Sequence, residues 1–179
     1  RESCDDYFYK GSLIVGNKKM SEGLKRYGLG AKTGVDLPNE FIGVVPSRDW
    51  KMKKYNRIWS IGETANTSIG QGDFLVTPLQ IAQYTALMAT GKLPTPHFAK
   101  YIGDEKYSPQ VKDVFNEKEK EKLPIIQKAM YEVCNYPQGT ATHYLSSNIV
   151  IAGKTGTAQV VAIKQDIEKR KLEHELAYY

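Results

Sequence analysis

The segment that most constrains the fold of this chain lies near its C-terminal end, at residues 148–161. An apolar, β-branched run enters the segment and another leaves it, which is the pattern of a buried strand. Gly153 and Gly156 interrupt it, and a glycine inside a strand marks a place where another backbone or a ligand comes close. We therefore expect a rigid strand. It would carry one cation and two hydroxyl groups, namely Lys154, Thr155 and Thr157.

The sequence Lys154-Thr155-Gly156 admits three interpretations. A phosphate-binding loop would need a glycine at the position of Asn148 and would open a helix, so this interpretation fails. The simplest alternative is an ordinary strand with a chance lysine. The third is the Lys-Thr-Gly strand of one group of serine enzymes, in which it accompanies a Ser-x-x-Lys and a Ser-x-Asn motif. Only the rest of the chain can decide between the last two.

Length and composition indicate a globular domain. The chain has 179 residues, of which 41% are hydrophobic, enough for one core. No apolar run approaches the ~18 residues of a membrane span, and the first residues do not resemble a signal peptide. There is no initiating methionine. We expect residues 1–179 to be an internal part of one domain of a longer protein.

The net charge of +5 is concentrated at residues 48–59, where five basic residues and three aromatic ones stand with a single acid. Such a run could bind nucleic acid or another anionic polymer. A solvated helix or loop with its aromatic rings turned inward is more common, so we interpret it as surface and expect no nucleic acid partner. The two cysteines, Cys4 and Cys134, and the three scattered histidines have no metal-ligand spacing. We expect two free thiols, no metal and no cofactor.

Periodicity and capping residues predict several helices. One is expected within residues 6–15 and a second within 20–27, ended by Gly28. The best-defined helix starts at Thr77, with Pro78 at its first position and Gln80 three residues after the cap, and ends at Gly91. Its inward residues are expected to be Leu79, Ile81, Tyr84, Leu87 and Met88.

The other segments are predicted from glycine, proline and charge. Residues 28–40 form an ordered loop, in which a second Lys-Thr-Gly at 32–34 lacks the apolar run of a strand, and residues 60–76 form a tight turn. Residues 93–115 are connector or short edge strands. Asn116 caps a charged helix, Pro124 opens a separate helix that ends near Asn135, and residues 162–179 form a charged, helical surface excursion.

Four separated stretches then point to one family. They are Ser3-Cys4-Asp5 before a helix, the loop at 33–38, the glycine turn at 68–72 with the helix start at 76–80, and Gly139-Thr140-Ala141 ahead of 154–159. Their order and spacing resemble the transpeptidase domain of class B penicillin-binding proteins, in the branch that serves cell elongation. The resemblance covers nearly the whole chain.

Three departures from the family pattern stand beside this resemblance. No Ser-x-x-Lys occurs anywhere in the chain, so the nucleophile is expected upstream, and the closing strands of the sheet are expected beyond Tyr179. Asp5 stands where the wider family has asparagine, which exchanges an amide donor for an anion. Ser146-Ser147-Asn148 fits Ser-x-Asn by its letters, but it is out of order, and we set it aside.

The resemblance implies an α+β fold of the penicillin-binding protein and serine β-lactamase type, here mostly the helical lobe plus the Lys-Thr-Gly strand. It implies a peptidoglycan D,D-transpeptidase that transfers an acyl group from D-Ala-D-Ala stem peptides to a neighbouring amine through a serine acyl-enzyme, and that β-lactams inhibit. Ser3 would relay a proton to the leaving nitrogen, Asp5 would orient the lysine of the missing motif, and Lys154 would keep the field positive and bond Ser3.

The same resemblance assigns substrate binding to the strand. The hydroxyls of Thr155 and Thr157 would hold the substrate carboxylate, the Thr157 N–H would form half of an oxyanion hole, and Gly156 would leave room for the substrate backbone. The alternatives are that Ser3 and Asp5 only cap a helix and that both threonines are ordinary strand residues.

The implied partners are peptidoglycan stem peptides, β-lactams, a glycan-polymerising membrane protein and elongation scaffold proteins. The implied location is the periplasm, on an inner-membrane anchor outside this chain. A non-catalytic penicillin-binding sensor or scaffold domain remains the alternative function, and the upstream sequence would distinguish it. A β-lactamase would share the Lys-Thr-Gly strand, but the loops at 28–40 and 68–80 favour the transpeptidase.

Overall fold

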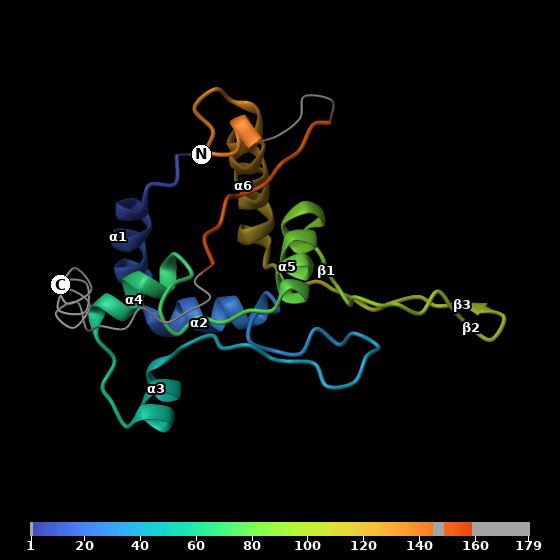
Figure 1. Ribbon diagram of the computed structural model, residues 1–179, viewed down its shortest axis with the longest axis horizontal. Helices are drawn as coiled ribbons and strands as arrows, with labels where there is room; N and C mark the ends of the chain where they lie inside the picture. The colour runs from blue at the N-terminus through green and yellow to red at the C-terminus, as the bar shows by residue number, and fades with distance from the viewer. Residues whose placement is uncertain (1, 145–148, 159–179) are drawn as a thin grey trace, which may run out of the picture.

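The computed structural model describes residues 2–144 and 149–158 (Figure 1). The helices in these residues are α1 (Asp5–Val15), α2 (Asn17–Arg26), α3 (Arg48–Tyr55), α4 (Ile61–Ser68), α5 (Pro78–Thr90), α6 (Glu117–Asn135) and the short 3₁₀ turn η1 (Thr142–Tyr144). The strands are β1 (Leu93–Pro94), β2 (Tyr101–Ile102), β3 (Glu105–Lys106) and β4 (Val111–Lys112). This mixture agrees with the predicted α+β class. The predicted helical excursion at 162–179 lies outside the described residues.

The short strands form a two-part antiparallel arm. β1 pairs with β4, with Leu93 opposite Lys112, and β2 pairs with β3, with Tyr101 opposite Lys106. The arm projects from the end of α5, with β2 and β3 at its tip (Figure 1). The prediction of connector or short edge strands at 93–115 is confirmed.

Helix α5 forms as its sequence predicts. Thr77 and Gln80 make a complete capping box, Pro78 occupies the first turn, and Gly91 ends the helix in the left-handed conformation at φ 75°. The inward face was predicted only in part. Leu87 and Met88 are buried, but Ile81 is 45% exposed, and two glutamines, Gln80 and Gln83, are buried instead.

The buried glutamines of α5 hydrogen-bond to the loops around it. Gln80 is fully buried, and its amide nitrogen donates to the carbonyl oxygens of Ala31 at 2.6 Å and Ile42 at 3.0 Å. Gln83 donates to the carbonyl of Pro94 at 2.8 Å. Loop carbonyls lack the backbone hydrogen bonds that helices and sheets provide, so the side-chain amides of these glutamines donate to them instead. Hydrophobic periodicity cannot detect this role.

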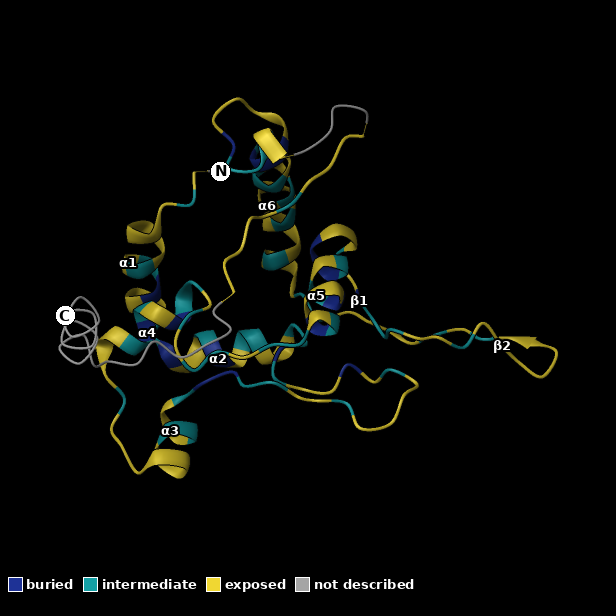
Figure 2. Cartoon of the chain, in the orientation of Figure 1, coloured by how far each residue is buried: buried dark blue, intermediate teal, exposed yellow. Residues whose placement is uncertain are grey.

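The apolar core lies where α5, β1 and α6 meet. Leu87, Met88 and Leu93 form its buried centre. Partly buried apolar side chains of α2, α5, α6 and the connecting segments surround it: Tyr27, Tyr84, Val114, Phe115, Leu123 and Met130. Figure 2 shows buried residues here and also between α1, α2 and α4, where the buried side chains are polar, and most of the remaining chain is exposed or half-buried.

The loop at 28–40 is ordered by two carboxylates. Asp36 accepts from the backbone N–H groups of Ala99 at 2.7 Å and Phe98 at 2.8 Å, and these bonds hold the pKa of its carboxyl below the usual value. Glu40 accepts from the N–H of Thr33 at 2.8 Å. Asp36 therefore ties the loop to the part of the arm between β1 and β2, and the prediction of an ordered loop is confirmed.

Helix α6 corrects one prediction. Asn116 and Glu119 form the expected capping box, but the helix continues through Pro124 to Asn135 instead of breaking into two. A proline inside a helix removes one backbone bond, here to the carbonyl of Lys120. Lys120 is exposed, so water can solvate that carbonyl, and the capping box holds the first turn. The helix therefore tolerates the proline.

A second correction concerns residues 60–76, predicted as a tight turn. Helix α4 occupies 61–68 and packs against α1, with Ser60 and Glu63 forming a complete capping box at its start. This Ser-x-x-Glu signal is legible in the sequence. The turn follows α4, with left-handed glycines at Gly70 and Gly72.

The basic segment at 48–59 forms the exposed helix α3, which has no buried residue. Trp50 and Trp59 are half-buried, as expected for inward rings, whereas Tyr55 is exposed. The ammonium of Lys54 lies 4.9 Å from the ring centres of both Trp50 and Tyr55. The interpretation of this run as surface is confirmed.

Both cysteines are free thiols, with Cys4 exposed and Cys134 buried. Within residues 2–144 and 149–158, no helix combines the length and the apolar content needed to cross a membrane. In the same residues, no group of three His, Cys, Asp or Glu side chains is placed to hold a metal ion.

We predict that Gln80→Leu lowers the free energy of unfolding of the full-length protein by about 2–4 kcal/mol, because it removes a fully buried amide that bonds the carbonyls of Ala31 and Ile42 and the N–H of Thr77. Gln110→Leu, at an exposed position, is the control and should change it by less than about 0.5 kcal/mol. Urea unfolding measures both. Equal effects of the two substitutions would contradict the role given to Gln80.

We predict that Gly139→Ala destabilises the turn after α6. A Cβ there would lie 2.3 Å from the Val133 carbonyl oxygen, so the turn must shift, at a cost of about 1–3 kcal/mol. Gly11→Ala inside α1 meets nothing within 4 Å and should stabilise the protein by up to about 1 kcal/mol. Thermal unfolding of both variants tests the contrast, and a Gly139→Ala protein as stable as the wild type would refute it.

Candidate functional site

The segment at 149–158 does not form the predicted buried strand. It runs as extended chain without a paired strand, and Ile149 and Val150 are 74% and 75% exposed. A strand is defined by backbone bonds to a neighbouring strand, and none lies beside this segment among the described residues. The remainder of the predicted strand, residues 148 and 159–161, lies outside them, as does the Ser146-Ser147-Asn148 sequence.

The C-terminal end of α6 holds this segment in place. The N–H of Gly153 donates to the carbonyl of Met130 at 3.0 Å, and the amide of Asn135 donates to the carbonyl of Ile151 at 2.8 Å. A Cβ on Gly153 would lie 3.5 Å from the sulfur of Cys134, an ordinary contact. In Figure 1 the segment descends past α6 towards the end of α4. Helix α6 thus supplies the bonds that a strand would otherwise give.

Lys154 and Thr155 lie together on the exposed side of this segment. The ammonium of Lys154 donates to the carbonyl oxygen of Thr155 at 2.8 Å and to its hydroxyl at 3.2 Å. The Thr155 hydroxyl also lies 3.1 Å from the hydroxyl of Thr140, on the turn after α6. A cation and two hydroxyls therefore meet at one exposed point, where an anion would find several donors.

Gly156 and Thr157 continue the segment towards the turn after α4. A Cβ on Gly156 would meet nothing within 4 Å, so the space beside its backbone is open. The carbonyl of Thr157 accepts from the side-chain amide of Gln71 at 3.2 Å. Gln71 stands between two left-handed glycines, Gly70 and Gly72, which fix the turn that presents it.

Ser3 has a strained and unusual environment just before α1. Its φ of 51° lies in the left-handed region, which costs a residue other than glycine free energy, and its buried hydroxyl has no hydrogen-bond partner. The predicted bond between Lys154 and Ser3 is therefore absent. The exposed lysine turns to the carbonyl of its own neighbour, which is the nearest acceptor.

The alternative that Ser3 and Asp5 cap α1 receives no support. The N-cap position is Cys4, and no side chain makes a capping bond there. Asp5 is the first residue of the helix and is exposed, so its charge lies near the positive end of the helix dipole.

Three residues that contact the segment had no assigned role in the sequence. They are Gln71, Asn135 and Thr140. Gln71 and Thr140 belong to two of the sequence motifs that indicate the family, so their part of the chain could be recognised from the sequence. Their contacts were not, because side chains 15 or 86 residues away from their partners leave no periodic signal.

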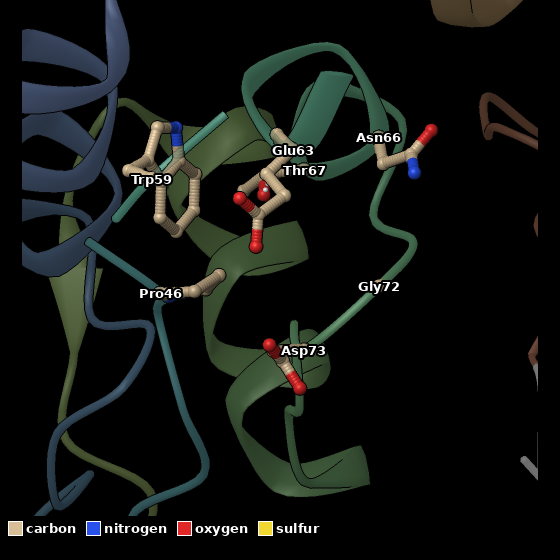
Figure 3. Close-up of a pocket in the computed structure, with 7 residues that line it drawn as sticks. All are labelled: Pro46, Trp59, Glu63, Asn66, Thr67, Gly72 and Asp73. Atoms are coloured by element: carbon tan, nitrogen blue, oxygen red, sulfur yellow. Dashed lines mark hydrogen bonds between the residues drawn. The ribbon is translucent and has the colours of Figure 1, made fainter. Parts of the chain in front are cut away.

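A separate cavity of about 150 Å³ lies between α4 and the segments around Pro46 and Asp73 (Figure 3). Burial raises the pKa of Glu63 on its wall, but hydrogen bonds from Lys51 and Ser60 outweigh burial and leave that pKa lowered. The cavity contains none of the predicted site residues. Its lining is Pro46, Trp59, Glu63, Asn66, Thr67, Gly72 and Asp73.

Comparison with protein families gives one match across almost the whole chain. The family described as penicillin binding protein transpeptidase domain matches residues 1–175. The fold of the described residues is also shared: the complex between penicillin-binding protein PBP2 and MreC from Helicobacter pylori contains a chain that is 53% identical, with a TM-score of 0.82 over 89% of this chain and 29% of that one.

Curated relatives agree. The peptidoglycan D,D-transpeptidase MrdA of Haemophilus influenzae is 36% identical over 92% of this chain, and that of Acinetobacter baumannii is 37% identical over 97%. The chain spans only 26% and 27% of the length of these two relatives. The expected α+β transpeptidase fold is confirmed by these likenesses, and the chain belongs to the penicillin-binding protein transpeptidase domain family.

Proposed function

We propose that this chain is part of a peptidoglycan D,D-transpeptidase whose site includes the Lys154–Thr157 stretch. The observation that carries the proposal is the meeting of the Lys154 ammonium with the Thr155 hydroxyl beside the open space at Gly156. Family membership and relatives named as D,D-transpeptidases support the reaction class.

The proposed reaction is acyl transfer in two steps. A serine outside this chain attacks the carbonyl of the penultimate D-alanine of a stem peptide, an ester forms, and the terminal D-alanine leaves with a proton on its nitrogen. An amine of a neighbouring stem peptide then attacks the ester, a new amide forms, and the serine recovers its proton. β-Lactams follow the first step and remain bound as the ester.

The proposed roles follow from what each group can donate. Lys154 keeps the local field positive, and the hydroxyls of Thr155 and Thr157 bind the substrate carboxylate. The N–H of Thr157 donates to the oxyanion as negative charge develops there. Gly156 leaves room for the substrate backbone to lie alongside the segment.

Ser3 and Asp5 complete the proposed set. Ser3 passes a proton to the leaving nitrogen. Its left-handed backbone and its unpartnered, buried hydroxyl support a functional role, because both features cost stability. It would approach Lys154 once substrate or the rest of the domain is in place. Asp5 orients the lysine of the motif that contains the nucleophile.

We further propose that the whole protein works in the periplasm on an inner-membrane anchor, beside a glycan-polymerising membrane partner and elongation scaffold proteins. The similarity to a PBP2 chain solved in complex with MreC supports a scaffold partner. The stem peptides themselves are the substrate, and the proposal requires no metal or cofactor.

We predict that the full-length protein gains a single covalent adduct when incubated with benzylpenicillin, and that Lys154→Ala slows this acylation by on the order of 10²-fold or more. Lys32→Ala is the matched control, because Lys32 stands in the second Lys-Thr-Gly sequence and outside the proposed site. Intact-mass analysis over time measures all three proteins. Acylation of Lys154→Ala at the wild-type rate would refute the role of this lysine.

Turnover separates an enzyme from a sensor. With a stem peptide ending in D-Ala-D-Ala and an added amine, the full-length protein should release D-alanine and form the cross-linked product, as mass spectrometry would show. Adduct formation with benzylpenicillin but no D-alanine release would instead establish a non-catalytic penicillin-binding domain.

A further inference from the structure

Thr140 lies beside the proposed carboxylate-binding group but belongs to a different part of the chain. Its hydroxyl is 3.1 Å from that of Thr155, although 15 residues separate the two in sequence. It stands in the Gly139-Thr140-Ala141 motif, which the roles proposed above do not use. The question is what Thr140 does to the hydroxyl of Thr155.

The turn that carries Thr140 is fixed on both sides. The N–H of Gly139 donates to Tyr136 at 2.8 Å, and that of Ala141 donates to Val133 at 3.1 Å. Gly139 is buried against the end of α6, where no larger residue fits. Thr140 is thus presented by rigid backbone, whereas Thr155 stands on an exposed, extended segment. Thr140 can therefore orient the hydroxyl of Thr155.

The donors and acceptors around the Thr155 hydroxyl show where its proton points. A hydroxyl has one proton to donate and two lone pairs to accept with. The Lys154 ammonium can only donate, so its 3.2 Å contact occupies one lone pair of the Thr155 oxygen. If Thr140 donates to the other, the proton of Thr155 has no partner within this cluster and points outward.

We propose that Thr140 is a positioning residue that donates to Thr155 and thereby directs the Thr155 hydroxyl proton to the carboxylate of the bound substrate or β-lactam. This rests on the proposed function. Accepting two hydrogen bonds, one from a cation, also polarises the Thr155 hydroxyl and strengthens it as a donor. Thr140 acts only through the Thr155 hydroxyl, which bonds the carboxylate of the ligand. Its effect should therefore disappear when the ligand has no carboxylate.

The test compares two ligands that differ only in that group, benzylpenicillin and its methyl ester, on the full-length protein. Thr140→Val removes the hydroxyl and keeps the shape of the side chain. We expect it to slow acylation by benzylpenicillin about 3–10-fold, the equivalent of one net hydrogen bond, and acylation by the ester less than about 2-fold. Thr140→Ser, which keeps the hydroxyl, should restore most of the benzylpenicillin rate.

The matched control is Thr142→Val, two residues along the same turn, where the lost hydroxyl donates to the carbonyl of Tyr136. It should affect both ligands equally. The ratio of the two rates is taken within each protein preparation, so a change in the folded fraction cancels. A double-mutant cycle adds that Thr140→Val should have no further effect on the ratio once Thr155 is valine.

The results separate this inference from the function on which it rests. If the wild-type protein is acylated but Thr140→Val slows both ligands equally, or neither, Thr140 is structural and the inference is wrong. If the wild-type protein forms no adduct with benzylpenicillin, the proposed function fails and the inference fails with it.

Discussion

The site depends on how an extended segment obtains its backbone hydrogen bonds. Residues 149–158 carry the cation and hydroxyls of the proposed site, yet no strand lies beside them in the part of the chain that the structure describes. The end of α6 replaces that strand through Met130 and Asn135, and the turn after it adds Thr140. These bonds hold the half-buried Gly153 and its exposed neighbours against the end of α6, so α6 sets the path of the segment.

The same demand explains the polar interior around α5. The loops on either side of this helix bring carbonyl groups inward, and Gln80 and Gln83 satisfy them where apolar residues could not. The apolar core at Leu87, Met88 and Leu93 is correspondingly small. Many apolar side chains elsewhere are exposed, such as Ile14 at 87% and Phe41 at 82%.

Backbone strain and open space both occur among the residues of the proposed site, at different positions. Ser3 holds a left-handed backbone and an unpartnered hydroxyl, and Gly156 has free space beside it. The strain at Ser3 costs stability, and the open space at Gly156 forgoes packing contacts. Proteins tend to retain such features at functional sites. The site in this structure is nonetheless not assembled, since Lys154 bonds its own neighbour rather than Ser3.

The sequence by itself determined the local structure where short-range chemistry decides it, namely the capping boxes of α5 and α6 and the glycine that ends α5. It also determined the family, through motifs whose order can be read directly. It could also have revealed α4 through Ser60 and Glu63. Tertiary structure alone decided that Pro124 stays within one helix, that Gln80 and Gln83 are buried, and that residues 149–158 lie against α6 without a strand partner. These outcomes depend on groups far apart in sequence, and a local pattern carries no record of which distant carbonyl or hydroxyl will need a partner.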